Sequence, residues 1–300
     1  TSITYGTLNT IIGGVAGDAI TSGIRNTAVG YGALGAEEEG DYSVAIGYNA
    51  LVLQVSDATG QDVNNTAVGA GAGATLTSGI QNTFIGSGVA STGTVTGDTN
   101  LGVGYGSMTN LGSGGSNTAI GKYAAYSLTT GSNNTFLGTD AGRTGSPGGP
   151  VSTGSNQLCL GDENVSAFYC AVDTISTSDE RDKTDINELD LGLEFVNKLT
   201  PVTFKWDKRG KYIDKSDPSV DLNAVVPDGT HKDDWLNVGF LAQDVTEIEA
   251  EYGYSIADKT NLTTDLTDDE TQYGLKYNRF VPMLVKAVQE LSAEVEKLKK

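Results

Sequence analysis

Asn26-Thr27-Ala28-Val29-Gly30 and Asn117-Thr118-Ala119-Ile120-Gly121 are two copies of one pattern: asparagine, threonine, two apolar residues and a glycine. With some substitutions the pattern occurs nine times, at 9–13, 26–30, 43–47, 65–69, 82–86, 100–104, 117–121, 134–138 and 157–161. Its closing glycines lie 17, 17, 22, 17, 18, 17, 17 and 23 residues apart. So regular an interval indicates a repeat protein in which each copy is one structural unit.

Each repeat predicts one rung of a β-solenoid or β-roll. Short β-branched runs are bounded by turn signals such as Thr77-Ser78-Gly79, as is typical of short strands. Because stacked strands lie about 4.8 Å apart, nine rungs predict a rod roughly 40 Å long. The two longest intervals predict loop insertions, which contain residues 56–60 and 146–154.

The strand pattern also predicts self-association. Ala28 and Val29 point to opposite faces of their strand, and both are apolar. A 17-residue rung encloses only a thin core, so the second face needs another chain, which favours a homo-oligomer. The recurring asparagine fits either a side-chain ladder along the rod or a turn position that asparagine tolerates, and the sequence leaves both open.

Composition changes sharply between Ala171 and Ser178. Residues 1–175 contain 34 of the 40 glycines and three basic residues, whereas residues 176–300 contain both tryptophans and 16 of the 19 basic residues. We therefore predict a mainly β repeat shaft over 1–175 and a small α+β domain over 176–300. In the second part, helices are expected near 190–199 and 244–252, and strands near 202–206 and 237–242.

The overall composition excludes several functions. A net charge of −19 argues against binding nucleic acid or an anionic membrane. The chain lacks an apolar run long enough to cross a membrane, so no membrane insertion is expected. Cys159 and Cys170 are expected as free, partly buried thiols, and the single histidine, His231, rules out a histidine zinc cluster within one chain. No metal or other cofactor is expected, and Thr1 indicates a piece of a longer or processed protein.

A heptad pattern lies at the C-terminus. Apolar residues recur at alternating intervals of four and three, with valine at one core position and leucine at the other, as in a coiled coil. The pattern predicts a trimerising helix over about 276–300, or alternatively an amphipathic helix docked on its own domain. The seam consists of Tyr277, Val281, Leu284, Val288, Leu291, Val295 and Leu298.

Three further stretches carry a family resemblance. Ser178-Asp179-Glu180-Arg181-Asp182-Lys183 is followed by Ile186, then by Val238-Gly239-Phe240-Leu241-Ala242-Gln243-Asp244-Val245 and by Tyr277-Asn278-Arg279-Phe280-Val281-Pro282-Met283-Leu284. Together they resemble the intramolecular chaperone auto-processing domain that ends phage tailspikes, endosialidases and tail fibres. The repeats resemble the trimeric β-roll heads of autotransporter adhesins at 43–47, and phage tail-fibre repeats at 26–34.

The resemblance implies a reaction as well as a fold. Such a domain trimerises, helps the preceding β-fibre to fold in register, and cleaves its own chain before the serine of the motif. Carried over, the cut lies between Thr177 and Ser178, with Ser178 and Lys183 as the dyad. A serine needs a base, and a lysine can serve if burial or a neighbouring cation lowers its pKa. Arg181 is a candidate for that cation, and Asp179 for orienting Lys183 or the turn.

Geometry restricts where this motif can lie. Residues five apart do not share a helix face, so we expect the motif in a turn or an extended segment. The reaction would be a single-turnover autoproteolysis without an external substrate. Single turnover suits a site that is assembled only in the folded trimer.

These features predict a structural tail-fibre protein of a virion, assembled in the host cytoplasm as a homotrimer. A host-cell receptor or glycan is a further candidate partner. The alternative is a cellular trimeric adhesin with the same self-processing domain. A third class, an enzyme acting on host glycans, would need paired carboxylates in a groove of the repeats, and the repeats show no such pair.

Overall fold

The computed structural model describes residues 6–171, 176–215, 217 and 219–299. The chain divides into two compact units. One comprises residues 1–165 together with 209–226, and the other comprises residues 166–208 together with 227–300. The second part of the sequence therefore contributes to both units.

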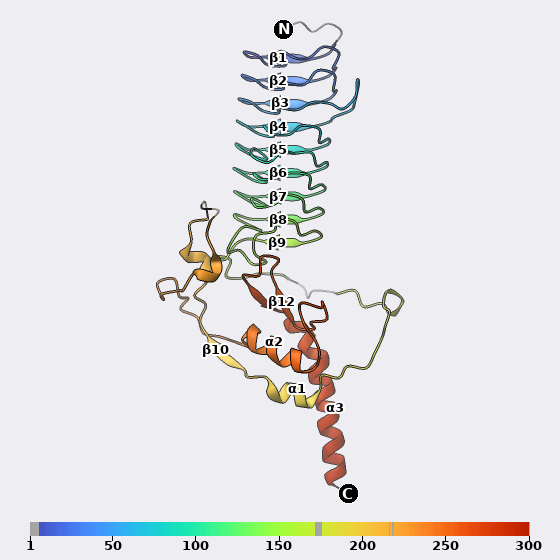
Figure 1. The fold of residues 1–300 in the computed structure, drawn as a ribbon, viewed down its shortest axis with the longest axis vertical. Coiled ribbons are helices and arrows are strands. Elements are labelled where there is room, and N and C mark those ends of the chain that lie inside the picture. Colours follow the sequence, from blue (N-terminus) through green and yellow to red (C-terminus); the bar gives the residue numbers. More distant parts are fainter. Residues whose placement is uncertain (1–5, 172–175, 216, 218, 300) are drawn as a thin grey trace. The chain divides into compact units, whose positions relative to one another are not determined.

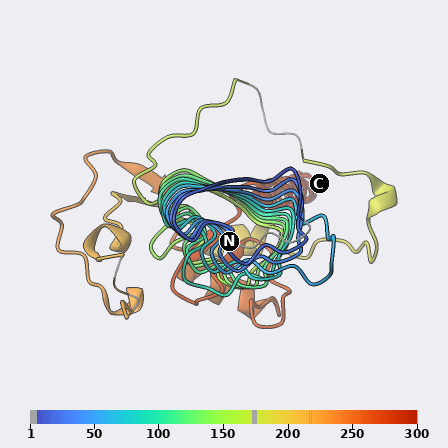
Figure 2. The same cartoon turned by 90° about the horizontal axis from the view of Figure 1, so that it is seen from above.

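The repeats form a parallel β-solenoid, as predicted. Each repeat supplies one three-residue strand, and the strands pair in strict sequence order (Figure 1). Seen along the stack, the rungs lie over one another (Figure 2). The strands are β1 Thr10–Ile12, β2 Thr27–Val29, β3 Val44–Ile46, β4 Thr66–Val68, β5 Thr83–Ile85, β6 Leu101–Val103, β7 Thr118–Ile120, β8 Thr135–Leu137 and β9 Leu158–Leu160.

The strand register pairs equivalent positions of successive repeats. Thr10 pairs with Thr27 and Thr118 pairs with Thr135, so equivalent positions of successive repeats lie side by side. The same phase holds across the long intervals, where Thr135 pairs with Leu158. The extra residues are accommodated in the connections, because a shift of one residue would turn every core side chain outward.

Alternation along each strand separates a core row from an outer row. The middle residue of every strand from β2 to β9 is buried, and the third is partly or fully exposed. Large and small core residues complement each other along the stack, since Phe84 is paired with Ala67 on one side and with Gly102 on the other. A Cβ built on Gly102 would lie 2.7 Å from Val89 Cγ1 and 3.2 Å from Phe84 Cδ1, so glycine makes room for the phenyl ring.

The glycine that closes each repeat is required for two reasons. At Gly121 the backbone has φ of 142°, a conformation that residues with a side chain rarely adopt. A Cβ on Gly121 would also lie 2.4 Å from the carbonyl oxygen of Gly138 in the next rung. The spacing between rungs therefore excludes any larger residue here.

The recurring asparagines form a buried ladder. Asn117 Nδ2 donates to the carbonyl of Gly131 at 2.9 Å and to Asn100 Oδ1 at 3.0 Å. Asn117 Oδ1 accepts from the backbone N–H of Asn134 at 3.0 Å. Of the two readings that the sequence left open, the structure shows the ladder, which satisfies buried backbone groups of the neighbouring rungs.

One rung replaces the ladder asparagine with serine, and other side chains compensate. Ser43 is too short to reach the next rung, and Gln54 fills the gap by donating to Ser43 Oγ at 2.8 Å and accepting from Asn65 Nδ2 at 3.0 Å. Gln54 also donates to the buried carboxylate of Glu37 at 2.9 Å. Gln54 lies 17 residues after Glu37, at the equivalent position of the next repeat, and supplies the group that the shorter residue lacks.

Removing a ladder side chain is expected to destabilise the solenoid. Asn117→Ala would leave the Asn134 N–H and the Gly131 carbonyl without these partners, and each unsatisfied buried group costs about 1–3 kcal/mol. We expect a lower denaturant midpoint for the β transition in circular dichroism. The neighbouring half-exposed Thr118→Ala is the control and should cost less than about 1 kcal/mol. Equal midpoints for the two variants would contradict the ladder's role.

The second unit is a small α+β assembly. Its α-helices are α1 Leu193–Lys198, α2 Ala242–Glu251 and α3 Phe280–Leu298. Its strands form two antiparallel pairs, β10 Val202–Phe204 with β11 Asn237–Gly239, and β12 Thr264–Leu266 with β13 Tyr273–Leu275. The core consists of Leu191, Phe195, Val245, Phe280 and Met283.

One sequence expectation needs correction. Cys170 is exposed rather than partly buried, whereas Cys159 lies in the solenoid core, where burial raises the pKa of its thiol. The C-terminal helix starts with the 3₁₀ turn Tyr277–Arg279 and continues as α3 to Leu298, close to the bounds expected from the sequence. The hairpin of β12 and β13 had no clear signal in the sequence, since its strands are short and rich in polar residues.

A carboxylate from α3 caps the start of α1. Gly192 has no side chain to cap α1, and Glu290 Oε2 instead accepts from the backbone N–H of Leu193 at 2.7 Å. This hydrogen bond, helped by Lys286, lowers the pKa of Glu290 below its usual range. A lowered pKa means that the contribution to stability is present above the unfolded-state value of about 4.3 and is lost as the pH falls through the folded-state value.

We therefore expect Glu290→Gln to lower the thermal midpoint of the second unit at pH 7. The difference from the parent should shrink as the pH falls through the lowered folded-state pKa of Glu290 and vanish once the parent's carboxyl is protonated as well. Glu294→Gln, an exposed change on the same helix, is the control. A midpoint difference that stays unchanged as the pH falls would contradict the proposed cap.

Candidate functional site

The motif at 178–183 lies in a turn, as its spacing required. Residues Glu180–Asp182 form one 3₁₀ turn, flanked by extended backbone at Asp179 and Lys183. Asp179 caps the turn, because its Oδ1 accepts from the backbone N–H of Arg181 at 2.9 Å. The turn folds the chain back so that the side chains on either side of it can meet.

The structure brings Ser178 and Lys183 together. Lys183 Nζ donates to Ser178 Oγ at 2.7 Å, although the residues are five apart in the chain. The local turn alone produces this contact, with Asp182 N donating to the carbonyl of Asp179 at 3.2 Å and Lys183 N to that of Glu180 at 3.1 Å. A hydroxyl and an amine at this distance can exchange a proton directly.

Arg181 and Asp179 form an ion pair with each other. Arg181 Nη2 lies 2.6 Å from Asp179 Oδ2 and Arg181 Nε lies 3.0 Å from Asp179 Oδ1. The guanidinium lowers the pKa of the Asp179 carboxyl. In the single chain Arg181 thus faces Asp179, and Asp179 orders the turn; the roles expected for these two residues in catalysis stay predictions.

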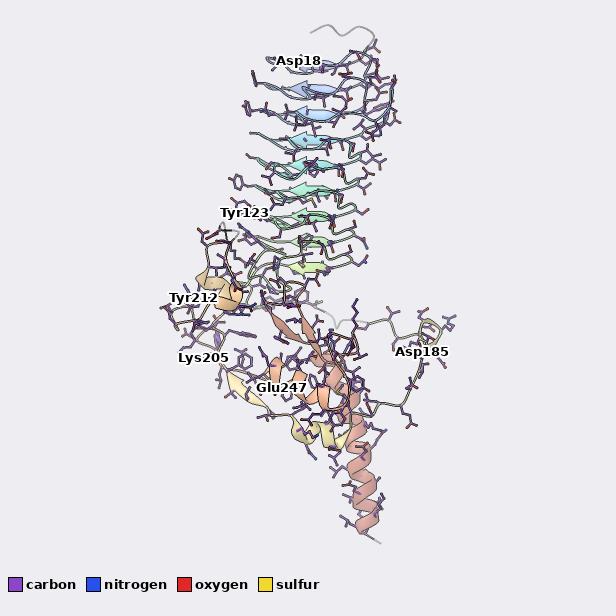
Figure 3. All side chains as sticks on the ribbon, in the orientation of Figure 1. Asp18, Tyr123, Asp185, Lys205, Tyr212 and Glu247 are labelled. Carbon is purple, nitrogen blue, oxygen red and sulfur yellow. The ribbon has the colours of Figure 1, made fainter. Side chains whose placement is uncertain are left out.

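The motif is open to solvent within one chain. Ser178 and Lys183 are both exposed, as is Thr177 before the predicted cut. The segment is marked in Figure 3 by Asp185, which lies just after it and away from the helices of the same unit. For Lys183 to accept a proton from Ser178 it must first be neutral, and burial is what favours a neutral lysine. In a single chain the hydrogen-bonded side chains of Ser178 and Lys183 are thus exposed to solvent.

Two of the other resembling stretches meet in space. Phe240 stacks on Tyr277 and Phe280 with ring centroids 6.2 Å and 5.3 Å apart. The Tyr277 hydroxyl accepts from the backbone N–H of Phe240 at 3.1 Å. This aromatic cluster joins the strand that ends at Gly239 to the start of α3, so it sets the direction in which the C-terminal helix leaves the domain.

Helix α3 has two apolar faces, one buried and one exposed. Phe280, Met283 and Ala287 are buried, the first two in the core with α1 and α2. The predicted heptad seam lies on another face and is exposed, with exposed fractions between 41% at Val295 and 87% at Leu298. The helix is therefore docked on its own domain by one face, while its seam residues from Val281 to Leu298 lie exposed on another face. Tyr277, which precedes α3, contacts Phe240 and Phe280. The exposed seam residues are Tyr277, Val281, Leu284, Val288, Leu291, Val295 and Leu298.

Within the described ranges, no three or more His, Cys, Asp or Glu residues are grouped so that they could hold a metal ion. No α-helix of the described part combines the length and apolar character needed to cross a bilayer.

One packing arrangement has no signal in the sequence. Residues 209–226 interrupt the second unit in the chain and pack with the repeats. Their acidic, basic and glycine residues give no periodic pattern, so only the fold could reveal the partner.

Comparison with known proteins locates a family within the second part of the chain. Residues 178–254 match the family described as chaperone of endosialidase. No curated protein sequence and no solved structure matches the chain. The match starts at Ser178, the first residue of the turn motif. Residues 178–254, which follow a nine-strand parallel β-solenoid in the sequence, are thus similar to the chaperone of endosialidase family.

Proposed function

We propose that this chain is a subunit of a homotrimeric viral tail fibre whose C-terminal domain directs assembly and then cuts itself from the shaft between Thr177 and Ser178. The observation that carries the proposal is the family match that begins at Ser178, where a serine and a lysine are already in hydrogen-bond contact. The solenoid would serve as the shaft that the virion presents to a host-cell receptor or glycan.

The exposed seam of α3 supports assembly at the C-terminus. Valine and leucine alternate at the core positions of a coiled coil, and their exposure in one chain leaves an apolar stripe facing water. Burial of such a side chain is worth about 1.5–3 kcal/mol, so several per chain favour association. Further copies of the same helix present the complementary seam, which makes a second and third copy the natural partners.

The solenoid has a matching apolar row. The third residue of each strand faces outward, at the same register in every rung. A row of this kind along a soluble rod marks a surface that another molecule covers. Additional copies of the rod would cover it along its whole length, which explains why both faces of the strand are apolar. The row includes Ile12, Ile46, Ile85, Ile120, Leu137 and Leu160, all exposed.

The need for a chaperone follows from the repeat. Nearly identical rungs permit several chains to pair one repeat out of phase, and pairing distant strands is slow. Chains that are first joined at their C-termini start from a common register and at high local concentration. Removing the joining domain afterwards makes unfolding difficult to reverse and leaves a kinetically stable shaft.

The proposed cleavage uses groups of the turn motif and one water. Lys183 takes the hydroxyl proton of Ser178, and Oγ attacks the carbonyl carbon of Thr177. The C–N bond breaks as the proton passes to the leaving nitrogen, which gives an ester on Ser178 and a free α-amine. Water then hydrolyses the ester to a Thr177 carboxylate and restores the Ser178 hydroxyl. Enclosure of the exposed Lys183 by neighbouring chains would make cleavage depend on assembly.

The proposal is tested on the unmodified protein. Light scattering should give the mass of a trimer, and denaturing electrophoresis should show two fragments. Amino-terminal sequencing should identify Ser178 as the first residue of the smaller fragment. Mass spectrometry should show that the larger fragment ends at Thr177. A monomer with an uncut chain would overturn the proposal, whereas an uncut trimer would remove only the self-cleavage.

A further inference from the structure

Residues 209–226 belong to the second part of the sequence but pack on the shaft. They lie between β10 and β11 in the chain and include the 3₁₀ turns Arg209–Tyr212 and Leu222–Ala224. Their compact unit is that of the repeats (Figure 3, where Tyr212 marks the segment and Tyr123 the rungs). We call residues 209–226 the docking segment.

The docking segment contacts the shaft backbone directly. A Cβ built on Gly210 would lie 2.8 Å from the carbonyl oxygen of Gly145, and a Cβ built on Gly145 would lie 2.8 Å from Gly210 Cα. Neither residue tolerates a side chain without displacing the other. Gly145 lies at the start of the long insertion in the last repeat interval. This insertion therefore forms part of the shaft surface that contacts the docking segment, which we call the seat.

Charged side chains make the second contact. Lys215 Nζ lies 2.6 Å from Glu163 Oε2, 3.5 Å from Asp140 Oδ2 and 3.6 Å from Asp162 Oδ2. The Lys215 side chain is only 13% exposed, and the three carboxylates are between 6% and 16% exposed. Shielding from water strengthens the attraction and makes separation costly, because it would take Lys215 away from three shielded carboxylates.

Arg143 completes the seat from the shaft side. Its guanidinium lies 4.7 Å from the ring centroid of Tyr123 and 4.3 Å from that of Tyr126, and it pairs with Asp140 at 2.9 Å. Arg143 Nη2 also donates to the backbone carbonyl of Lys215. The rings hold the guanidinium in place, so the shaft presents both three carboxylates for the lysine side chain and a donor for its backbone carbonyl.

We propose that the docking segment is a latch that holds the C-terminal fragment on the shaft after the chain has been cut. The inference rests on the proposed cleavage at Thr177. All shaft residues of the seat precede that bond and Lys215 follows it, so hydrolysis leaves every contact of the latch intact. Departure of Lys215 would remove the ammonium group that lies within 3.6 Å of three shielded carboxylates. Cutting and release are therefore separate steps, and the second is governed by this charge cluster.

The test compares retention of the fragment in the cut protein. The parent, Lys215→Met and the exposed-lysine control Lys232→Met are first examined by denaturing electrophoresis to verify cutting. Each is then passed through a size-exclusion column under native conditions over a range of protein concentrations. We expect the two fragments of the parent and of the control to elute together. In Lys215→Met the fragments should separate, with retention weakened by about 100-fold or more.

A second variant covers the case in which Lys215→Met does not assemble. Glu163→Gln keeps the shape of the closest partner and removes its charge, and it should weaken retention by about tenfold. Co-elution of the fragments of Lys215→Met and Glu163→Gln at every concentration where the parent's fragments co-elute would overturn the latch. Separation of the parent's own fragments would overturn it as well.

Failure of the proposed cleavage is distinguishable from failure of the latch. If the chain stays intact, chymotrypsin can cut at the exposed Phe168 and Tyr169, which lie between the seat and Ser178. The same column comparison then measures the latch on the severed protein. Co-elution that depends on Lys215 would support the latch although self-cleavage had failed.

Discussion

Ser178→Ala is expected to leave every chain at its full 300 residues, whereas the parent should be found as fragments 1–177 and 178–300. The alanine removes the oxygen that attacks Thr177 and leaves the backbone of the turn unchanged, because the hydrogen bonds of the turn come from backbone groups and Asp179. Loss of an essential nucleophile lowers a rate by orders of magnitude, so the change should be close to complete within the time of expression. Denaturing electrophoresis and intact mass measure it.

The matched control for this variant is Ser176→Ala, which removes an exposed hydroxyl two residues upstream. The control should be cut like the parent. Lys183→Ala should also stay uncut, since Ser178 then loses its hydrogen-bond partner at 2.7 Å. Cleavage of Ser178→Ala to the parent's extent would contradict the assignment of the nucleophile, and normal cleavage of Lys183→Ala would move the role of base to another group.

The seam variant Leu284→Asp/Leu291→Asp is expected to abolish trimerisation. Each change removes about 1.5–3 kcal/mol of apolar burial per chain, and each places like charges together at the axis of the coiled coil. The monomer's own fold should survive, because the face of α3 that packs in the domain core consists of Phe280, Met283 and Ala287. Light scattering should report a monomer, and circular dichroism should retain the helix signal of the domain.

A single aspartate on another face of the same helix provides the control. Ala293→Asp is exposed and lies off the seam, so the trimer should persist. The seam variant should also stay largely uncut if cleavage depends on enclosure of Lys183 by neighbouring chains. A monomeric seam variant that is cut as fast as the parent would show that the turn motif is sufficient by itself. Trimers of the seam variant would exclude α3 as the assembling element.

The candidate site was predictable where local chemistry determines it. Ser178 and Lys183 are joined by one turn, so the contact needs only six consecutive residues, and the spacing had already excluded a helix. The sequence was a weaker guide to Arg181 and Asp179. Arg181 was expected beside Lys183, but in the structure it forms an ion pair with Asp179, because opposite charges attract. The heptad seam was visible for the same local reason, whereas the burial of Phe280 and Met283 depends on α1 and α2, which are distant in sequence.

The amino-acid sequence by itself determined the solenoid and its register, because the repeat places a turn glycine in every rung, a ladder asparagine in most rungs and a core residue at the same strand position. Short-range rules of this kind need no knowledge of the rest of the chain. Only the tertiary structure decided that Gln54 and Glu37 repair the ladder at Ser43, and that Lys215 enters an acidic seat on the shaft. These contacts join residues from 11 to 75 positions apart without a repeating pattern. Their partners are chosen by proximity in the folded chain and by the cost of leaving a buried polar group alone.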